Sequence, residues 1–243
     1  MICAIIPTYE NPRTLRTVVT SVRAHIEHVV VIDDGSSESS RKVAEELATE
    51  GLCALVVRAR NGGKGAAVKT GLTWAREHGF AQALQIDADL QHDPNDIPAL
   101  LEAARDSEGA LVLAQPVFDA SAPRSRLIAR KISKFWVAVE TMSMRVGDPL
   151  CGFRIYPVEL AERVAAHGDA MDFDPEIAVR LVWAGAKVKH VPTRVRYISR
   201  EEGGISHFRN VKDTWLISLA HSRLCLEGIW SFATRLAGRR ARA

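Results

Sequence analysis

Short apolar runs alternate with helix-like segments through the first 115 residues, and this alternation restricts the chain to very few folds. The runs occupy residues 2–6, 29–32, 52–57, 81–86 and 110–114. All of them except residues 81–86, which include two glutamines, are continuously apolar, which is typical of a strand buried on both faces of a parallel sheet. The segments between them place apolar residues three and four positions apart, as amphipathic helices do. The pattern predicts an α/β fold with a mainly parallel, Rossmann-like sheet that helices cover on both faces.

The pattern changes after Pro116. Residues 119–135 are basic and rich in small side chains, which predicts a loop that leads into a helix through Phe135, Trp136 and Val139. Residues 147–154 are rich in turn formers, a helix is expected to open at Phe173, and residues 187–198 alternate like a strand. We therefore divide the chain at about residues 115 and 210.

The C-terminal segment, residues 211–243, is expected to be an amphipathic helix with a basic end. Apolar residues from Val211 to Leu236 cover much of its surface, and Arg235, Arg239, Arg240 and Arg242 follow with no acid between them. Such a helix either packs on the core or lies in a membrane interface, where tryptophans are common. Both interpretations stay open.

Composition narrows the class of protein. The apolar content of 47% and the charged content of 25% are ordinary for a globular protein, and a net charge of +3 does not favour nucleic acid as a partner. The four cysteines are widely spaced and the chain does not begin with a signal-peptide pattern, so we expect a cytoplasmic protein with reduced thiols. No apolar run approaches the roughly 20 residues that span a bilayer. Membrane contact would therefore be peripheral, on the inner face.

Polar residues follow three of the predicted strands. Thr8-Tyr9-Glu10, Asp33-Asp34 and Asp87-Ala88-Asp89 should lie along one edge of the sheet, where open α/β sheets bind ligands. Acidic clusters repel a bare phosphate, so a divalent cation is needed between them. Asp89, with Gln91 or Asp87, supplies the oxygen ligands that Mg²⁺ or Mn²⁺ prefers, and a diphosphate would complete the shell.

The turn Asn61-Gly62-Gly63-Lys64-Gly65 resembles two phosphate-binding motifs and matches neither. A Walker loop needs Ser or Thr after the lysine, and the dinucleotide fingerprint needs a glycine where Val68 stands. ATP hydrolysis and NAD binding are therefore disfavoured. The glycines permit close approach of a backbone, and Lys64 could face a phosphate or a base.

Six motifs together resemble the family 2 glycosyltransferases, in the branch of the polyprenyl-phosphate sugar synthases. They are Ile6–Asn11, Val31–Ser36, Asn61–Gly65, Asp87–His92, Gly152–Arg154 and Gly204–Phe208, in the family's order. The resemblance covers residues 2 to about 210. It implies a GT-A fold, a UDP- or GDP-sugar donor, a divalent metal and inversion at the anomeric carbon. Residues 1–115 would bind the nucleotide sugar and residues 116–210 the acceptor.

By position, the resemblance also implies roles for particular residues. Asp89 would be the catalytic metal ligand, with Gln91 and Asp87. The nucleotide would be held by Pro7, Tyr9, Glu10, Asp34, Lys64, Asp87 and Ala88. The acceptor or the diphosphate would be bound by Arg124, Arg126, Arg130, Arg196, Arg200 and Ser206, and Arg154 would close over one of the two.

The acceptor decides the chemistry. A phosphate acceptor of a lipid-linked, membrane-held kind is already anionic and needs no base. A hydroxyl acceptor needs a carboxylate, for which Asp174 and Glu176 are candidates, although acids there also suit a helix N-terminus. The Asp174-Pro175-Glu176 turn resembles glucosyl-phosphate relatives more than mannosyl ones, so the sugar stays open. The tail from Val211 lacks the multispan domain of some relatives.

Two other classes compete with a glycosyltransferase. A nucleotidyltransferase that makes nucleotide sugars is expected to carry a glycine-rich basic loop after its first strand, where this chain has Pro7-Thr8-Tyr9-Glu10. A non-catalytic module that binds nucleotide sugars would have no need of both Asp87 and Asp89.

Overall fold

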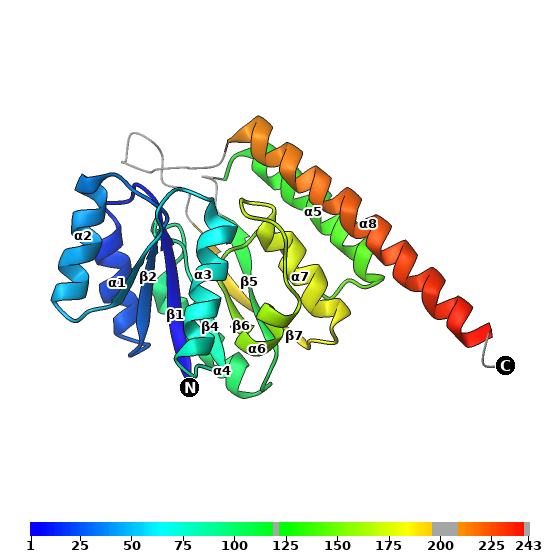
Figure 1. Ribbon diagram of the computed structural model, residues 1–243, viewed down its shortest axis with the longest axis horizontal. Helices are drawn as coiled ribbons and strands as arrows, with labels where there is room; N and C mark the ends of the chain where they lie inside the picture. Colours follow the sequence, from blue (N-terminus) through cyan, green and yellow to red (C-terminus); the bar gives the residue numbers. More distant parts are fainter. Residues whose placement is uncertain (119–121, 196–208, 241–243) are drawn as a thin grey trace.

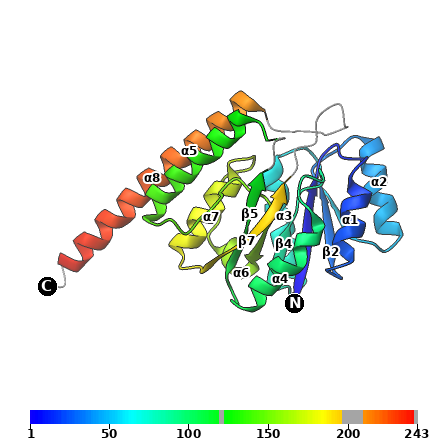
Figure 2. The same cartoon turned by 180° about the vertical axis from the view of Figure 1, so that it is seen from behind.

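The apolar runs of the sequence form the strands of one seven-stranded sheet (Figures 1 and 2). In this computed structural model the described residues are 1–118, 122–195 and 209–240, and of these the side chains of 210 and 230–240 are not described. The strands are β1 (Ile2–Thr8), β2 (Val29–Asp33), β3 (Ala54–Val57), β4 (Gln82–Gln85), β5 (Leu111–Phe118), β6 (Arg154–Pro157) and β7 (Val188–Val195). Their order is β3-β2-β1-β4-β6-β5-β7.

The sheet is mainly parallel, as predicted, but one strand runs the other way. β6 pairs antiparallel with both β4 and β5, while β5 and β7 are parallel to each other. The sequence prediction placed only turns at 147–154 and gave no strand after them. Four residues carry too little periodicity to identify a strand, and the first of them is a buried arginine, Arg154.

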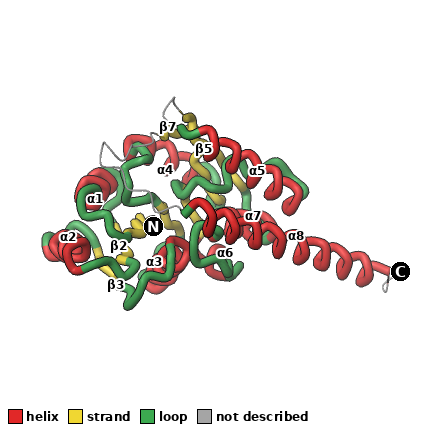
Figure 3. Tube along the Cα trace, turned by 90° about the horizontal axis from the view of Figure 1, so that it is seen from above, coloured by secondary structure: helices red, strands yellow, loops and turns green. Residues whose placement is uncertain are grey.

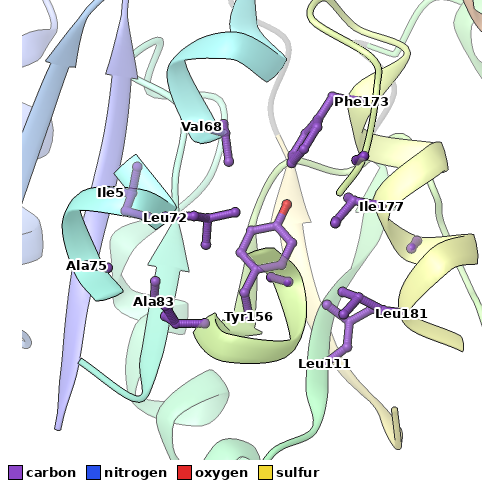
Figure 4. Close-up of a cluster of buried hydrophobic side chains, with 14 of the residues drawn as sticks. Ile5, Val68, Leu72, Ala75, Ala83, Leu111, Tyr156, Phe173, Ile177 and Leu181 are labelled. Atoms are coloured by element: carbon purple, nitrogen blue, oxygen red, sulfur yellow. The ribbon is translucent and has the colours of Figure 1, made fainter. Parts of the chain in front are cut away.

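Helices cover both faces of the sheet because successive strand residues point to opposite sides. Cys3 and Ile5 belong to the core on one face, with α3, α6 and α7, while Ala4 and Ile6 belong to the other, with α1, α2 and α4. The first core surrounds Tyr156, which lies among side chains from β1, β5, α3 and α7 (Figure 4). The expected two-sided α/β fold is confirmed.

The helices agree with the predicted ones, except that α1 and α5 begin at other residues than expected and that α6 was not expected. They are α1 (Leu15–Arg23), α2 (Glu38–Thr49), α3 (Lys64–Glu77), η1 (Pro94–Asp96), α4 (Ile97–Arg105), α5 (Arg124–Thr141), α6 (Val158–Arg163), α7 (Phe173–Trp183) and α8 (Asn210–Arg240). The Asn11-Pro12 pair in the sequence predicts an N-cap and a first helical residue, but α1 begins only after Thr14, and the short α6 was not predicted.

The basic stretch after Pro116 was predicted to stay a loop up to about Phe135, and for the described residues this was wrong. α5 is continuous from Arg124, directly after the extended Pro123. Its apolar residues Ile128 and Ile132 are at helical spacing but remain more than half exposed. Basic residues lie between these isoleucines, so the sequence does not stand out as an apolar stripe.

The first half of α8 packs on the body of the protein. It lies beside α5, and its far end extends past the other elements (Figures 1 and 3). Ala220 and Leu224 are buried, and His221 joins two buried α5 side chains, with Nε2 2.9 Å from Ser133 Oγ and Nδ1 2.8 Å from Glu140 Oε1. Core packing thus accounts for this part of the helix. Among the described residues, no helix has the length and apolar content needed to cross a membrane.

The register places the polar strand ends together, as predicted. Thr8 at the end of β1 pairs with Asp33 at the end of β2, and β4 runs parallel to β1 on its other side. Asp34 and Asp87 therefore follow β2 and β4, the two strands that flank β1, at one edge of the sheet. The N-terminus of α3 begins at the same edge with Lys64.

Candidate active site

Lys64 links two carboxylates at this edge of the sheet. Its Nζ lies 2.8 Å from Asp87 Oδ2 and 3.1 Å from Asp174 Oδ2, so it joins the end of β4 to the first turn of α7. A cation at the first residue of a helix opposes the helix dipole, and the two acids supply the compensation. The side chain of Lys64 is 14% exposed and that of Asp174 is 4% exposed. The cluster of one cation and two anions gains a second cation from Arg154, whose Nη2 lies 3.8 Å from Asp174 Oδ1, and Asp87, at 24% exposed, is at its open side.

The environment fixes the charge of this cluster. Burial alone would lower the pKa of Lys64, but Asp174 and Asp87 raise it well above its ordinary value. Burial would raise the pKa of Asp87, but the charge of Lys64 holds it below its ordinary value. Both groups are therefore ionised at neutral pH. Asp87 Oδ1 is buried, and a side-chain hydrogen bond from Gln85 also helps to lower the pKa of this carboxyl.

Gly152 packs directly on the Lys64–Asp87 pair. A Cβ at this position would lie 2.3 Å from Lys64 Nζ and 2.9 Å from Asp87 Oδ2, so any side chain would displace the pair. The glycine stands in the loop before β6 and brings that backbone against the site. From the sequence, Gly152 was identified only as part of a motif, without a physical reason why a glycine is needed there.

Arg154 lies beneath the site and does not face it. Its guanidinium is fully buried and donates to the carbonyls of Cys151, Asp174 and Pro149. It therefore joins the loop before β6 to the start of α7. We expected this residue to close over the diphosphate or acceptor, but here no part of the side chain is exposed to either. We propose a positioning role for it.

Asp34 holds the glycine-rich turn in place. Its carboxylate accepts hydrogen bonds from the amides of Gly62 (3.1 Å) and Gly63 (2.7 Å) and pairs with Arg58. The side chain is only 4% exposed, so a direct contact with a nucleotide would require this arrangement to open. Gly35 follows with a φ of +73°, and a Cβ there would lie 2.6 Å from the backbone of Arg60. The turn after β2, which holds Asp34 and Gly35, is thereby packed against the glycine-rich turn.

Glu10 binds the start of α2. Its carboxylate accepts from the Ser37 amide at 2.6 Å and from the Ser40 hydroxyl at 2.6 Å, and its backbone has a φ of 53°. Tyr9 is half-buried beside it, and Pro7 is buried within β1. Glu10 and Tyr9 thus lie at the edge predicted to take the nucleotide base and ribose. Their contacts to a nucleotide stay a prediction.

Asp89 has the character of a cation ligand. It lies two residues beyond Asp87, and Ala88 between them is buried, its carbonyl accepting from Thr14 Oγ1 at 2.5 Å. Burial, with the nearby charge of Asp87, raises the pKa of Asp89 to about 6, and its carboxylate forms no ion pair with the residues that the structure describes. Asp89 Oδ1 accepts from the backbone amide of Gln91 at 3.1 Å. These residues fit a divalent cation that also takes diphosphate oxygens.

The protein alone does not supply a complete metal shell in the part that the structure describes. No group of three His, Cys, Asp or Glu side chains is suitably clustered there. This agrees with a cation held by one or two carboxylates and otherwise by substrate, as is usual for Mg²⁺ at phosphates.

Residues 165–172, hereafter the α6–α7 loop, pack against the glycine-rich turn. Asp169 O accepts from the Ala66 amide at 2.9 Å and Ala170 O from the Gly65 amide at 3.2 Å. A Cβ at Gly63 would lie 2.5 Å from Asp169 O. It is therefore the α6–α7 loop, another segment of the chain, that approaches these glycines closely. Sequence reasoning missed this loop entirely, because none of its residues carries a recognisable motif.

A cleft of about 530 Å³ lies beside the Asp89 turn. It is bounded by Leu90 and Gln91 after β4 and by Phe118 and Arg194 at the ends of β5 and β7. His92 also lines it, and burial lowers the pKa of this imidazole to about 4, so the ring is neutral and no general acid at neutral pH. The lining is mostly apolar, and its charged residues are Asp93 and Arg194.

The predicted acceptor arginines are placed at the start of α5. Arg124 is exposed, Arg126 is half-buried, and Arg130 pairs with Asp148 at 2.6 Å. The Arg130 guanidinium also lies 5.0 Å from the centre of the Phe118 ring, beside the cleft. Arg196, Arg200 and Ser206 lie outside the described residues.

Glu176 is not placed as a catalytic base. Its side chain is fully buried, and it accepts from the amides of His167 (3.0 Å) and Gly168 (2.8 Å) and from Arg180 and Arg223. With four donors around it, the carboxylate has no position for a substrate hydroxyl. The reading of this acid as a base was wrong, because sequence spacing does not show which way a helix turns its first residues.

Comparisons with known proteins agree with this geometry. The model of glycosyl transferase family 2 matches residues 3–161. An uncharacterized protein of Methanocaldococcus jannaschii is 30% identical over 207 residues, which cover 80% of this chain and 87% of that protein. The polyprenol monophosphomannose synthase of Mycolicibacterium smegmatis is 27% identical over 210 residues, which cover 82% and 78%.

Solved structures give the same fold. The glucosyl-3-phosphoglycerate synthase of Mycobacterium tuberculosis, determined in complex with Mn²⁺, uridine diphosphate and phosphoglyceric acid, matches with a TM-score of 0.71. The match covers 93% of this chain and 78% of that one at 16% identity. At this identity the likeness shows the fold, and the GT-A expectation is confirmed.

Proposed function

The chain belongs to glycosyl transferase family 2, and from this premise we propose that it moves a sugar from a UDP- or GDP-sugar to a polyprenyl-phosphate-like acceptor held in a membrane. The observation that carries the proposal is the pair of unlike acids at the end of β4. Asp87 is ionised and held by Lys64, while the pKa of Asp89 is raised and its carboxylate forms no ion pair with the described residues. A nucleoside diphosphate with its divalent ion would supply a cation for Asp89.

Donor binding uses the edge formed by β1, β2 and β4. Asp89 and Gln91 would hold Mg²⁺ or Mn²⁺, which stabilises the charge that develops on the leaving diphosphate. Asp87, oriented by Lys64, would face the same ligand. The Mn²⁺ and uridine diphosphate bound by the mycobacterial enzyme of the same fold support this assignment.

The acceptor would approach from the cleft beside Asp89. A phosphate oxygen attacks the anomeric carbon as the bond to the nucleoside diphosphate breaks, and no proton has to be removed. Arg124 and Arg126 at the start of α5 would bind such a phosphate. Asp174 already pairs with Lys64, which disfavours it as a base and with it a hydroxyl acceptor. The similarity to a polyprenol monophosphomannose synthase supports the lipid phosphate and a mannosyl donor.

Two exposed apolar stripes support a membrane-held acceptor. On α5, Ile128 (58% exposed), Ile132 (55%) and Phe135 (61%) follow one another at steps of four and three residues. On α8, Trp215 (62%) and Leu226 (69%) belong to a similar stripe. Lysines and arginines accompany both. Adjacent amphipathic helices of this kind suit the surface of an anionic bilayer.

A transfer assay tests the proposal. Purified protein, Mn²⁺ and labelled GDP-mannose, UDP-glucose or UDP-N-acetylglucosamine are incubated with a polyprenyl phosphate in detergent, and label in the lipid phase is counted. We expect one donor to give a chelator-sensitive product. Label transferred to no lipid phosphate, but readily to a sugar hydroxyl, would contradict the acceptor class.

A further inference from the structure

The buried carboxylate of Glu176 joins three elements that are far apart in the chain. It stands in the first turn of α7, two residues after Asp174, which is in the Lys64 cluster. Its Oε1 accepts from the His167 amide and its Oε2 from the Gly168 amide, so it holds the α6–α7 loop. Burial would raise its pKa, but the His167 amide and Arg180 hold the pKa below its ordinary value, so this is a stable anion.

The α6–α7 loop in turn holds the glycine-rich turn. Its carbonyls at Asp169 and Ala170 accept the amides of Ala66 and Gly65, which are the residues after Lys64. Lys69, one turn further along α3, pairs with Asp169 Oδ1 at 2.7 Å. The first turn of α3 is therefore fastened to the loop by backbone and side chain together, and the position of Lys64 depends on where the loop lies.

The other side of Glu176 is fastened to α8. Arg223 Nη2 lies 2.5 Å from Glu176 Oε2, and Arg180 connects Glu176 to Glu227 with distances of 2.7 and 3.0 Å. Arg223 and Glu227 belong to the half of α8 that packs on the body. Docking of α8 thus adds a charge-assisted bond to the same carboxylate oxygen that accepts the Gly168 amide.

We propose that Glu176 is a positioning residue of the donor site and that α8, through Arg223, sets the position of the α6–α7 loop and of Lys64, so that docking of α8 and binding of the nucleoside diphosphate are coupled. The nucleotide part of this inference rests on the proposed function. The physical basis is a continuous chain of hydrogen bonds and ion pairs from α8 to Lys64. Because coupling is reciprocal, a nucleotide that orders Lys64 also stabilises docked α8.

Stability alone does not account for this arrangement. A buried ion pair is on average no more stabilising than apolar packing in its place, so the carboxylate is not needed merely to hold α8. Apolar side chains could not accept hydrogen bonds from the Gly168 amide and the Arg223 guanidinium, whereas one oxygen of Glu176 accepts both.

The test compares Arg223→Ala with Arg223→Lys and with Lys212→Ala. Arg223 is 38% exposed on its side chain, so its loss leaves room for solvent and should not prevent folding. Lys212 is an exposed basic residue of the same helix and controls for lost charge. Amide hydrogen exchange is measured on the metal-free, nucleotide-free protein, and affinity for UDP and GDP is then measured with Mn²⁺.

We expect Arg223→Ala to speed exchange at His167, Gly168, Gly65 and Ala66 by about fivefold or more, with no change in β1 and β2. Nucleotide affinity should weaken by about fivefold, the lower end of ordinary coupling. Arg223→Lys should restore part of both effects, and Lys212→Ala should leave both unchanged.

Faster exchange at Gly168 without any change at Gly65 and Ala66 would overturn the proposal, as would a uniform rise across the sheet, since that is global destabilisation. Unchanged nucleotide affinity together with faster exchange at all four amides would also overturn it. If the wild type binds neither nucleotide, the proposed function fails instead, and local exchange at Gly65 and Ala66 still supports or refutes the link from α8 to Lys64.

Discussion

Lys64 Nζ lies 2.8 Å from Asp87 Oδ2, so the cation of the glycine-rich turn is bound by the first acid of the motif that ends β4. This contact makes the two acids of Asp87-Ala88-Asp89 different. Asp87 is neutralised and stays ionised, whereas Asp89 carries a carboxylate whose pKa rises to about 6 because of burial and the charge of Asp87. One acid orients a ligand and the other requires a cation.

Replacing Lys64 with Met should destabilise the protein and weaken nucleotide binding. The change leaves Asp87 and Asp174 close together without the cation between them, and loss of one partner from a buried pair costs about 3 kcal/mol. Urea unfolding at pH 7.5 measures this loss. Lys64→Met combined with Asp87→Asn should recover part of the stability, because a repelling charge is removed. Additive losses in the double variant would contradict the pairing.

Gly152→Ala should damage the donor site far more than its size suggests. The new Cβ would lie 2.3 Å from Lys64 Nζ, so the Lys64–Asp87 contact has to break. We expect nucleotide affinity to fall by about tenfold, or roughly 1.4 kcal/mol, in calorimetric titration. The matched control is Gly228→Ala in α8, whose Cβ would meet Trp183 only at 3.5 Å. Equal affinities of these two variants would refute the close packing.

Asp89→Asn should stabilise the metal-free protein above about pH 6. The folded pKa of Asp89 is raised to about 6 from its ordinary value of 3.8, so the folded state favours the protonated acid. The stability from this preference is complete below about pH 4 and is lost as pH rises to about 6 and beyond. In chelator, the variant should therefore gain on the order of 2 kcal/mol over the wild type at pH 8 and little at pH 4, by chemical unfolding. A gain that is equal at both pH values would disprove a raised pKa.

The parts of the fold that sequence patterns predicted are those with long, regular periodicity. Strands such as β1 and β2 are buried on both faces and so are continuously apolar, and α3, α4 and α7 carry their apolar residues at helical spacing. β6 was not predicted because four residues show no period, and its buried Arg154 donates to the nearby carbonyls of Cys151 and Pro149 and to that of Asp174 in α7. Only the folded chain brings the Asp174 carbonyl to it.

The site was predictable in its location and less so in its contacts. The predicted strand ends located the ligand-binding edge of the sheet and the acidic residues there, because the carboxyl ends of parallel strands lie at one edge. The partners of Lys64 could not be predicted, since Asp174 is 110 positions away and no local pattern pairs them. The same holds for Asp34, which binds the amides of Gly62 and Gly63, and for Glu176, which binds α8 and not a substrate.

Substituting the exposed stripes should release the protein from anionic vesicles. Phe135→Glu and Trp215→Glu place charge on side chains that are 61% and 62% exposed, so folding should be little affected. We expect binding to phosphatidylglycerol vesicles in a cosedimentation assay to fall by about tenfold or more for the double variant. Glu102→Gln on α4, also at an exposed site, serves as the control. Unchanged cosedimentation would exclude these stripes as the membrane contact.

The central claim is that Asp89 carries the cation for a nucleoside diphosphate, and calorimetric titration of UDP and GDP tests it most directly. Wild type, Asp89→Ala and the exposed-site control Asp106→Ala are each titrated with Mn²⁺ and with chelator. We predict that Mn²⁺ strengthens binding of one nucleotide to the wild type and to Asp106→Ala by about a hundredfold, or roughly 2.7 kcal/mol, and gives no such gain in Asp89→Ala. Equal affinities of Asp89→Ala and wild type, with and without Mn²⁺, would contradict the account.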